Sequence, residues 1–280
     1  MDQEPDAVLV TSTPDGITTI TINRPNRRNA VDPATAQKLY TAVRAFEDDA
    51  SQKVLILNGN NGTFCAGFDL HSLATSKTAE ESQAGNVPVV ENARTIGPMG
   101  PSRLQISKPV ISAVSGYAVA GGLELSLLGD IRVAEEDAVF GVFCRRWGVP
   151  LIDGGTVRLQ AIVGLGRAMD MILTGRPVGA QEALAMGLAN RVVAKGKALE
   201  EAEVIARQLL TFPQECMNLD RTSAYYACYS AKTFDDALKY EFDHGVEVVV
   251  KESIKGAARF SGGMGRHGAF QAPAPVEGKL

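Results

Sequence analysis

The chain has 280 residues, of which 45% are hydrophobic and 21% charged, and its formal net charge at pH 7 is -4. These values describe a globular protein of one large or two small domains, without the basic surplus that a nucleic-acid backbone requires. Four cysteines without zinc-type spacing and only three histidines argue against a four-ligand metal cluster, and they favour a reducing compartment.

Targeting signals are weak at both ends of the chain. Residues 1–8 are acidic and polar, unlike a signal peptide. The most apolar stretch, residues 109–129, contains several glycines and Glu124, so we do not expect a membrane span. The terminal Gly278-Lys279-Leu280 only loosely resembles a peroxisomal address, and we expect a cytoplasmic protein, with peroxisome and mitochondrion as alternatives.

The first third of the chain predicts strands and one long helix. Residues 7–23 alternate apolar and polar side chains around Pro14-Asp15-Gly16, which predicts a strand, a turn and a strand. Asp32-Pro33 then opens a helix, with Asp as N-cap and Pro at the first helical position. Residues 54–59 form a short apolar run typical of a buried strand, and residues 71–100 predict a helix plus a loop.

The rest of the chain alternates strands with helices and then becomes helical. Residues 108–119 predict one buried strand followed at once by a helix, and strands are also expected within 131–141 and at 190–194. The alternation predicts an α/β core over residues 1–195, followed by a helical region over 196–260. Residues 261–280, rich in Gly, Ala and Pro, predict a flexible tail.

Glu124 is a carboxylate inside one of the most apolar segments of the chain. It follows Gly121-Gly122, where a strand gives way to a helix. The first turn of a helix offers unpaired N–H groups and partial positive charge, and glycine lets a ligand approach them. Such a turn suits a carbonyl oxygen that gains negative charge, with Glu124 beside it as acid or base. The alternative is that the glycines permit close packing and Glu124 caps the helix.

A second turn of the same kind follows the strand at 54–59. It contains Gly67, and Asp69 lies close to a predicted helix start. Two such turns, brought together, would supply one N–H each to one oxygen. This pairing favours the chemical interpretation of Glu124.

The two turns resemble the signatures of the crotonase (enoyl-CoA hydratase/isomerase) superfamily. The first signature stands here as Phe64-Cys65-Ala66-Gly67-Phe68-Asp69-Leu70, and the second runs from Lys108-Pro109 to Gly121-Gly122-Leu123-Glu124-Leu125. Residues 23–31, 130–141 and 173–193 also resemble the family, so the resemblance spans roughly residues 7–260.

The resemblance implies a fold, an assembly and a substrate. The fold is α/β, a spiral of ββα units with a C-terminal helical region that builds a homotrimer or hexamer. Apolar residues of the last helices, Val204, Leu209, Leu210 and Val248–Val250, agree with such an assembly. The implied substrate is an acyl-CoA thioester of fatty acid metabolism, with coenzyme A as part of the substrate and no metal or redox cofactor.

The resemblance also assigns residues. The backbone N–H groups of Phe68 and Gly121 form the oxyanion hole, although relatives usually carry a small residue at position 68. Glu124 is the catalytic acid/base. Contacts with coenzyme A map to Arg28, Ala30, Ala66, Asp69 and Leu70.

Cys144 departs from the hydratase pattern. Two-glutamate hydratases hold a water molecule between two carboxylates, and Cys144 stands where the second glutamate is expected. A thiol has a pKa near 8.5 and holds a catalytic water weakly, which puts efficient hydration in doubt. Cys144 as a nucleophile and Cys144 as a neutral buried thiol are both open, and no histidine is placed in the sequence to activate it.

Other residues near the predicted site have two interpretations each. Asp153 is a candidate second acid/base, or an N-cap for a helix starting at Gly154. Arg145 and Arg146 either fix an anion or lie on a solvated surface, and Trp147 is expected to pack. The tyrosines within 223–230 either line the pocket or belong to a core or trimer contact.

We therefore expect an acyl-CoA thioester-processing enzyme of the enoyl-CoA hydratase/isomerase type. Isomerisation, thioester hydrolysis and decarboxylation share the same oxyanion and stay open as alternatives to hydration. A rival from another class is a non-catalytic acyl-CoA-binding protein. Retention of Glu124 argues against that rival, and the acyl group itself is not specified by the sequence.

Overall fold

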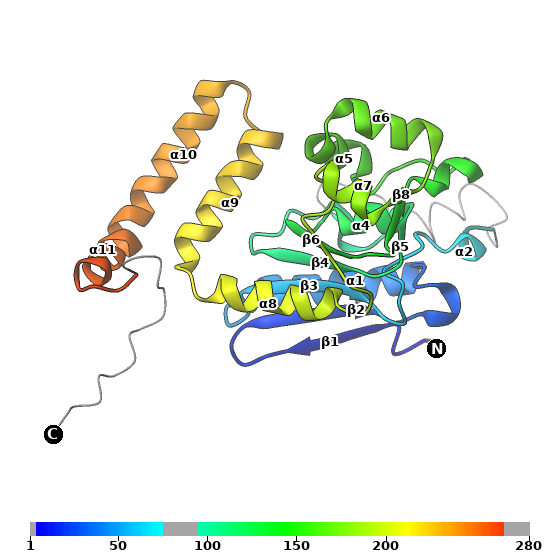
Figure 1. The fold of residues 1–280 in the computed structure, drawn as a ribbon, viewed down its shortest axis with the longest axis horizontal. Coiled ribbons are helices and arrows are strands. Elements are labelled where there is room, and N and C mark those ends of the chain that lie inside the picture. Colours follow the sequence, from blue (N-terminus) through cyan, green and yellow to red (C-terminus); the bar gives the residue numbers. More distant parts are fainter. Residues whose placement is uncertain (1–3, 75–94, 266–280) are drawn as a thin grey trace. The chain divides into compact units, whose positions relative to one another are not determined.

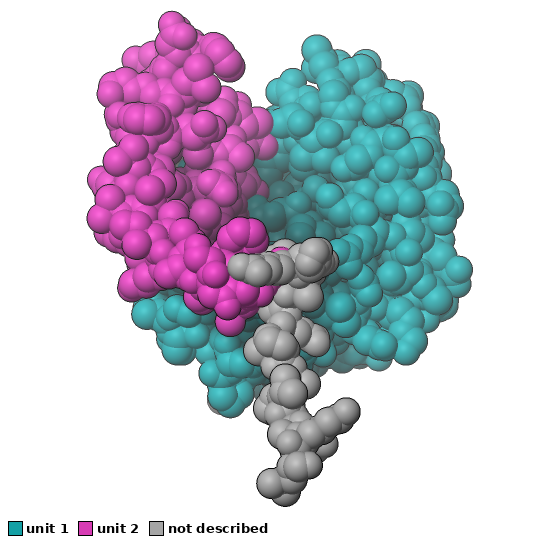
Figure 2. All heavy atoms as spheres, turned by 60° about the vertical axis from the view of Figure 1, so that its left-hand side comes forward, with its two compact units in different colours: residues 1–211 teal, residues 212–280 magenta. Residues whose placement is uncertain are grey.

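The computed structural model describes residues 4–74 and 95–265. The chain divides into two compact units, residues 1–211 and 212–280, coloured separately in Figure 2. The first unit extends beyond the expected boundary at residue 195. The predicted tail lies mostly outside the described residues, as does most of the predicted helix and loop at 71–100.

A six-stranded sheet with the order β1-β2-β3-β4-β6-β9 forms the frame of the first unit (Figure 1). β1 and β2 are the predicted antiparallel pair, and each of the neighbouring pairs from β2 to β9 is parallel. The predicted α/β class is therefore confirmed. The strands are β1 (Val8–Ser12), β2 (Ile17–Ile22), β3 (Val54–Gly59), β4 (Val110–Val114), β6 (Ile131–Glu135) and β9 (Arg191–Val193).

The single strand predicted over residues 108–119 is wrong, because the chain turns in the middle of it. β4 ends at Val114, and β5 (Tyr117–Val119) belongs to a second sheet with β7 (Val139–Gly141) and β8 (Val178–Gly179). Gly116 lies between them with φ of +51°, where a Cβ would be 2.3 Å from the carbonyl oxygen of Gly62. The turn carries the chain from the frame sheet to the sheet that bears the site.

Helix α1 (Pro33–Asp48) begins as the sequence predicts. The Asp32 carboxylate accepts a hydrogen bond from the Thr35 N–H at 2.8 Å, and Pro33 occupies the first helical position. The periodic residues Leu39, Val43 and Phe46 are buried in the main core. Shorter helices of this unit are η1 (Pro25–Arg27), α2 (Leu70–Ala74), η2 (Pro101–Arg103), α4 (Gly121–Ser126), η3 (Phe143–Trp147), α5 (Gly155–Val163), α6 (Leu165–Thr174) and α7 (Ala180–Ala185).

Helix α8 (Ala198–Leu210) explains why the first unit is longer than expected. It packs on β3, β4 and β6 (Figure 1). Ala198, Ala202, Ile205 and Ala206 are buried there in a second apolar core, together with Ile56 and other residues of the strands. The helix thus covers the sheet face and belongs to the core.

The second unit contains helices α9 (Gln214–Tyr229), α10 (Phe234–Val248), the π-helix η4 (Val249–Ser253) and α11 (Ile254–Ser261). Tyr226 of α9 stacks on Tyr240 of α10 with ring centroids 4.0 Å apart, and Tyr240 in turn stacks on His244. The ring centroids of Tyr225 and Tyr229, both on α9, lie 5.9 Å apart. Among the described residues of either unit, no helix is both long and apolar enough to cross a membrane.

Replacing Gly116 tests the turn between the two sheets. Gly116→Ala should lower the free energy of unfolding by about 1 kcal/mol from the left-handed backbone, plus about 1–3 kcal/mol from the contact with Gly62. Gly196→Ala is the matched control, because Gly196 has φ of +79° but open space around its Cβ position. Denaturant unfolding of both variants measures the difference, and equal losses would contradict the proposed contact.

Candidate active site

The two glycine-bearing turns predicted from the sequence lie against each other. The Cys65 N–H donates to the Tyr117 carbonyl at 2.8 Å, and the Val119 N–H donates to the Cys65 carbonyl at 3.1 Å. Gly67 has φ of +104°, and a Cβ there would lie 3.0 Å from the Gly121 nitrogen. The absence of a side chain at Gly67 is therefore what allows the two turns to meet.

The hydrogen bonds around Phe68 and Gly121 concern the two backbone N–H groups that the resemblance assigns as donors. Phe68 forms an isolated parallel bridge with Val31, in which Val31 binds the Gly67 carbonyl and the Asp69 N–H, both at 2.8 Å. That pattern leaves the N–H of Phe68 on the side away from Val31. Among the described residues, neither this N–H nor that of Gly121 has a hydrogen-bond acceptor.

Backbone strain accompanies this geometry at Ala120. Ala120 has φ of +55° and ψ of -126°, a conformation that residues with a Cβ rarely adopt. Its N–H is held by the Gly141 carbonyl at 2.8 Å. Such strain costs about 1–3 kcal/mol and persists only where the surroundings enforce it. Here the conformation of Ala120 sets the orientation of the Ala120–Gly121 peptide, which carries the Gly121 N–H.

A cavity of about 390 Å³ opens beside the two turns. It contains the two backbone donors, the side chain of Glu124 and a rim of cationic and aromatic residues. The residues that line it are Arg28, Ala66, Phe68, Leu70, Tyr117, Val119, Ala120, Gly121, Glu124, Phe143, Cys144, Arg146, Trp147, Val149 and Pro150.

Glu124 is buried, with 2% of its surface exposed, at the fourth position of α4. One carboxylate oxygen, Oε1, accepts hydrogen bonds from the N–H groups of Asp153 at 2.9 Å and Gly155 at 2.8 Å. A Cβ at Gly155 would lie 2.8 Å from that oxygen. Glu124 therefore does not cap its own helix, as the alternative interpretation held, but binds the first N–H of α5.

Burial raises the pKa of Glu124 to about 8, and the neighbouring charge of Asp153 acts in the same direction. The two backbone N–H donors act the other way, because they stabilise the anion. A carboxyl group whose pKa lies near neutrality exists in both protonation states under ordinary conditions. It can therefore accept and return a proton.

Asp153 lies next to Glu124, but its carboxylate is directed elsewhere. Oδ1 accepts hydrogen bonds from the Met99 N–H at 3.0 Å and from the Ser102 hydroxyl. Burial raises the pKa of Asp153 as well. Its side chain is outside the cavity-lining set, and it does not cap α5, whose N-cap is Gly154. Ser102 belongs to no motif in the sequence, so its contact with Asp153 was not predicted.

Cys144 lies in η3 and lines the same cavity as Glu124. It is buried, and both burial and the Glu124 charge raise the pKa of its thiol. A thiol with a raised pKa is protonated at neutral pH and is a poor nucleophile. These surroundings favour the neutral thiol over the nucleophile among the two interpretations.

The rim of the cavity includes residues whose role the sequence left open. Arg146 lines it and lies over the Phe143 ring, with its guanidinium carbon 4.2 Å from the ring centroid. Arg145 is exposed outside the lining set. Trp147 does not pack, as we expected, but is 71% exposed at the cavity wall. Nothing in the described part of the chain covers the Trp147 ring.

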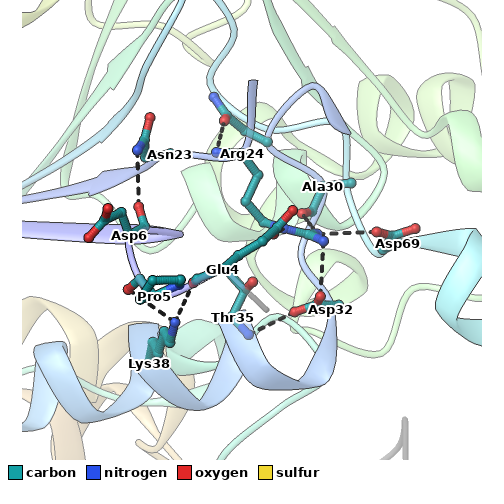
Figure 3. Close-up of polar contacts among 11 residues, drawn as sticks. Glu4, Pro5, Asp6, Asn23, Arg24, Ala30, Asp32, Thr35, Lys38 and Asp69 are labelled. Carbon is teal, nitrogen blue, oxygen red and sulfur yellow. Dashed lines mark hydrogen bonds and ion pairs between the residues drawn. The ribbon is translucent and has the colours of Figure 1, made fainter. Parts of the chain in front are cut away.

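The residues predicted to bind coenzyme A fall into two groups. Arg28, Ala66 and Leu70 line the cavity. Asp69 and the Ala30 carbonyl are instead bound by the guanidinium of Arg24 (Figure 3). Arg24 is a buried cation that we did not single out, because the sequence gives no sign that the residues around it would enclose it.

The layered α/β unit carries a buried carboxyl group, Glu124, in a cavity that Phe68 and Gly121 of the two glycine turns also line. The chain belongs to the enoyl-CoA hydratase/isomerase family, in the crotonase superfamily, since the model of that family matches residues 12–261. The predicted resemblance is thereby confirmed.

Relatives and solved structures agree with this assignment. The chain is 33% identical to enoyl-CoA hydratase EchA19 of Mycobacterium tuberculosis, over 86% of this chain and 88% of that protein. It is 36% identical to a carnitinyl-CoA dehydratase of Salmonella typhi, over 68% and 70%. The crystal structure of an enoyl-CoA hydratase from Mycobacterium tuberculosis superposes with a TM-score of 0.81 at 33% identity, covering 91% of this chain and 96% of that one.

The raised pKa of Glu124 predicts a specific dependence of stability on pH. Between about pH 4.5 and 8 the unfolded chain has released the Glu124 proton while the folded chain retains it. Folded protein then binds more protons, so the free energy of unfolding falls as pH rises through that window. Glu124→Gln lacks this proton, and its stability relative to wild type should rise from pH 5 to pH 8. Denaturant unfolding at several pH values checks this, and a difference independent of pH would contradict the buried carboxyl.

Proposed function

We propose that this protein acts on acyl-CoA thioesters, binding the thioester carbonyl between the N–H groups of Phe68 and Gly121. The observation that carries the proposal is the meeting of these two donors with Glu124 in one cavity. The names of the relatives, which include hydratases and a dehydratase of CoA thioesters, support the substrate class.

The proposed chemistry begins at the carbonyl oxygen. Two N–H donors stabilise the negative charge that develops on that oxygen when a proton leaves Cα, and the product of this step is an enolate. Glu124 in its ionised form accepts the Cα proton, and in its protonated form returns it. Its position is fixed by the N–H groups of Asp153 and Gly155. The free oxygen, Oε2, is the atom that exchanges the proton.

A single carboxyl group favours reactions that move one proton. Among the described cavity-lining residues, Glu124 is the sole carboxylic acid. Hydration requires one group to activate water and a group to protonate Cα, whereas double-bond isomerisation moves a proton between two carbons with one group. We therefore favour isomerisation of an enoyl thioester over rapid hydration. Hydrolysis and decarboxylation use the same oxyanion and are outcomes of the same substrate panel.

The rival proposal is a binding protein without catalysis. It would require Glu124 to have no chemical role. The raised pKa of Glu124, together with its place in the wall of the cavity, supports a role as acid/base. We therefore prefer the enzyme.

Exposed apolar residues of the second unit support self-association. Phe234, Leu238, Phe242 and Val246 recur every fourth residue along α10, with Phe234 76% and Phe242 71% exposed. That spacing places them on one face of the helix. The spacing continues with Val250 and Ile254, each more than half exposed, and Phe260 of α11 is also exposed. Of the residues named from the sequence, Val204 is also exposed, whereas Leu209 and Leu210 pack on the second core. We propose a homotrimer or hexamer.

The missing second glutamate gives a kinetic prediction. Wild-type hydration of crotonyl-CoA should be slow, and Cys144→Glu should raise it by placing a second carboxyl group opposite Glu124. Glu124→Gln should lower the native thioester activity by about 10²–10⁴-fold, because it keeps the shape and removes the base. Loss of the conjugated-thioester absorbance measures hydration, and chromatography of products across an enoyl-CoA panel separates isomerisation from the alternatives.

Cys228→Glu is the control for that experiment, because Cys228 is exposed on α9 and outside the cavity-lining set. It should leave all rates unchanged. Fast wild-type hydration that survives Glu124→Gln would show that the chemistry does not depend on this residue.

Assembly has its own test. Light scattering should give three or six times the chain mass of 29.7 kDa at micromolar concentration. Phe242→Glu should shift the mass towards the single chain, because it buries a charge in the proposed contact. Lys239→Glu, on the same helix but already charged and exposed, should not. A monomeric wild-type protein would refute the proposal.

A further inference from the structure

Arg24 is a cation enclosed by three acidic side chains (Figure 3). Only 5% of its side chain is exposed. Its guanidinium lies 2.9 Å from the Asp32 carboxylate and 3.1 Å from that of Asp69, and it also pairs with Glu4. A buried guanidinium is stable only when its donors are matched in this way.

The partners of Arg24 belong to two different segments of the chain. Asp32 and the Ala30 carbonyl lie on the segment that precedes α1, and Asp69 lies on the turn that follows β3. A single guanidinium nitrogen, Nη1, donates to both the Ala30 carbonyl and the Asp69 carboxylate. The planar fork of arginine is suited to holding several acceptors in fixed directions. Arg24 therefore joins the segment at 28–32 to the turn at 66–69.

The joined segments are the ones that orient Phe68. Val31 brackets the Phe68 peptide through its hydrogen bonds to Gly67 and Asp69. Asp32 and Asp69 are the residues that follow Val31 and Phe68 in their segments. Arg24 pairs with both acids, so its guanidinium links the two segments beside the Val31–Phe68 bridge. Phe68 lies in no helix or extended strand, so its orientation depends on this local bridge.

Arg24 is itself fixed from the opposite side. The backbone N–H of Arg24 donates to the Asn29 side-chain carbonyl at 2.8 Å, and the Asn29 amide donates to the carbonyls of Asn60 and Thr63. Arg28 and Asn29 adopt positive φ values of 50° and 56° in this turn. The backbone of Arg24 is thus anchored, through Asn29, to the chain that leads from β3 to the site, and its paired side chain is only 5% exposed.

We propose that Arg24 is a positioning residue for the oxyanion donor at Phe68, acting through Asp69. The inference rests on the proposed function, because it concerns the N–H group that binds the thioester carbonyl. Neither Arg24 nor Asp69 is among the residues that line the cavity. Their part is to keep the Phe68 N–H aligned, since a donor displaced by a fraction of an ångström loses most of its effect on the developing charge.

Two acidic partners of Arg24 provide a matched pair of variants. Asp69→Asn and Asp32→Asn each remove one negative charge from the same guanidinium without changing side-chain shape. Asp32 and Asp69 also bind backbone N–H groups, of Thr35 and His71 respectively, which asparagine can still accept. Asp69 follows Phe68 directly in the chain, whereas Asp32 reaches Phe68 only through Val31. A purely structural role therefore predicts similar effects of the two variants, and a positioning role through Asp69 predicts a larger effect of Asp69→Asn.

The readout is the absorbance of a bound conjugated dienoyl-CoA, whose band moves to longer wavelength when its carbonyl is polarised. All proteins carry Glu124→Gln to prevent turnover, and affinity is measured in the same titration. Asp69→Asn should lose at least half of the shift while the Kd changes less than about threefold. Asp32→Asn should retain clearly more of the shift than Asp69→Asn does. With Glu124 restored, Asp69→Asn should lower kcat by about 10–100-fold, less than the loss of a whole oxyanion donor.

Arg24→Lys provides a second route if Asp69→Asn does not fold. Lysine keeps the charge but cannot hold Asp32, Asp69 and Ala30 together, so its shift should fall as well. A full shift in folded Asp69→Asn or Arg24→Lys would overturn the inference while leaving the proposed function in place. A reference protein that binds the ligand with no shift, or does not bind it, would overturn both.

Discussion

The close approach of Gly67 to Gly121 is the constraint on which the site depends. A Cβ at Gly67 would lie 3.0 Å from the Gly121 nitrogen, and a Cβ at Gly122 would lie 2.0 Å from the Cys65 carbonyl oxygen. These glycines let two backbone turns from different sheets touch. Their contact brings Phe68 and Gly121 to the wall of one cavity, which Glu124 of α4 also lines.

Burial then determines the electrostatics of that space. Glu124 and Asp153 are both almost fully buried, and burial raises the pKa of each above its ordinary value; the neighbouring charge of Asp153 raises the pKa of Glu124 further. The two carboxyl groups have different surroundings. Asp153 accepts hydrogen bonds from Met99 and Ser102, whereas Glu124 lines the cavity. A buried pair of this kind maintains a carboxyl group that exchanges a proton near neutral pH.

The sequence predicted the features that depend on local pattern. The antiparallel β1–β2 pair, the Asp32-Pro33 helix start and the two glycine turns follow from alternation, capping and positive φ. It missed what depends on contacts between distant residues. The turn at Gly116 was predicted as strand, because the residues on both sides of it are apolar although they belong to two different sheets. The hydrogen bond from Ser102 to Asp153 was missed because it joins residues 51 positions apart. Arg24 was missed because its acids come from positions 4, 32 and 69.

Calorimetric titration of the protein with an acyl-CoA and with the matching free acid tests the central claim most directly. The paired donors and the cavity should bind the thioester at least about tenfold more tightly than the acid, because an acid carboxylate would place a negative charge beside Glu124 and lacks the coenzyme A contacts. Gly67→Ala should weaken thioester binding, since its side chain would press on the Gly121 N–H. Equal affinity for both ligands, or no affinity for the thioester, would contradict the account.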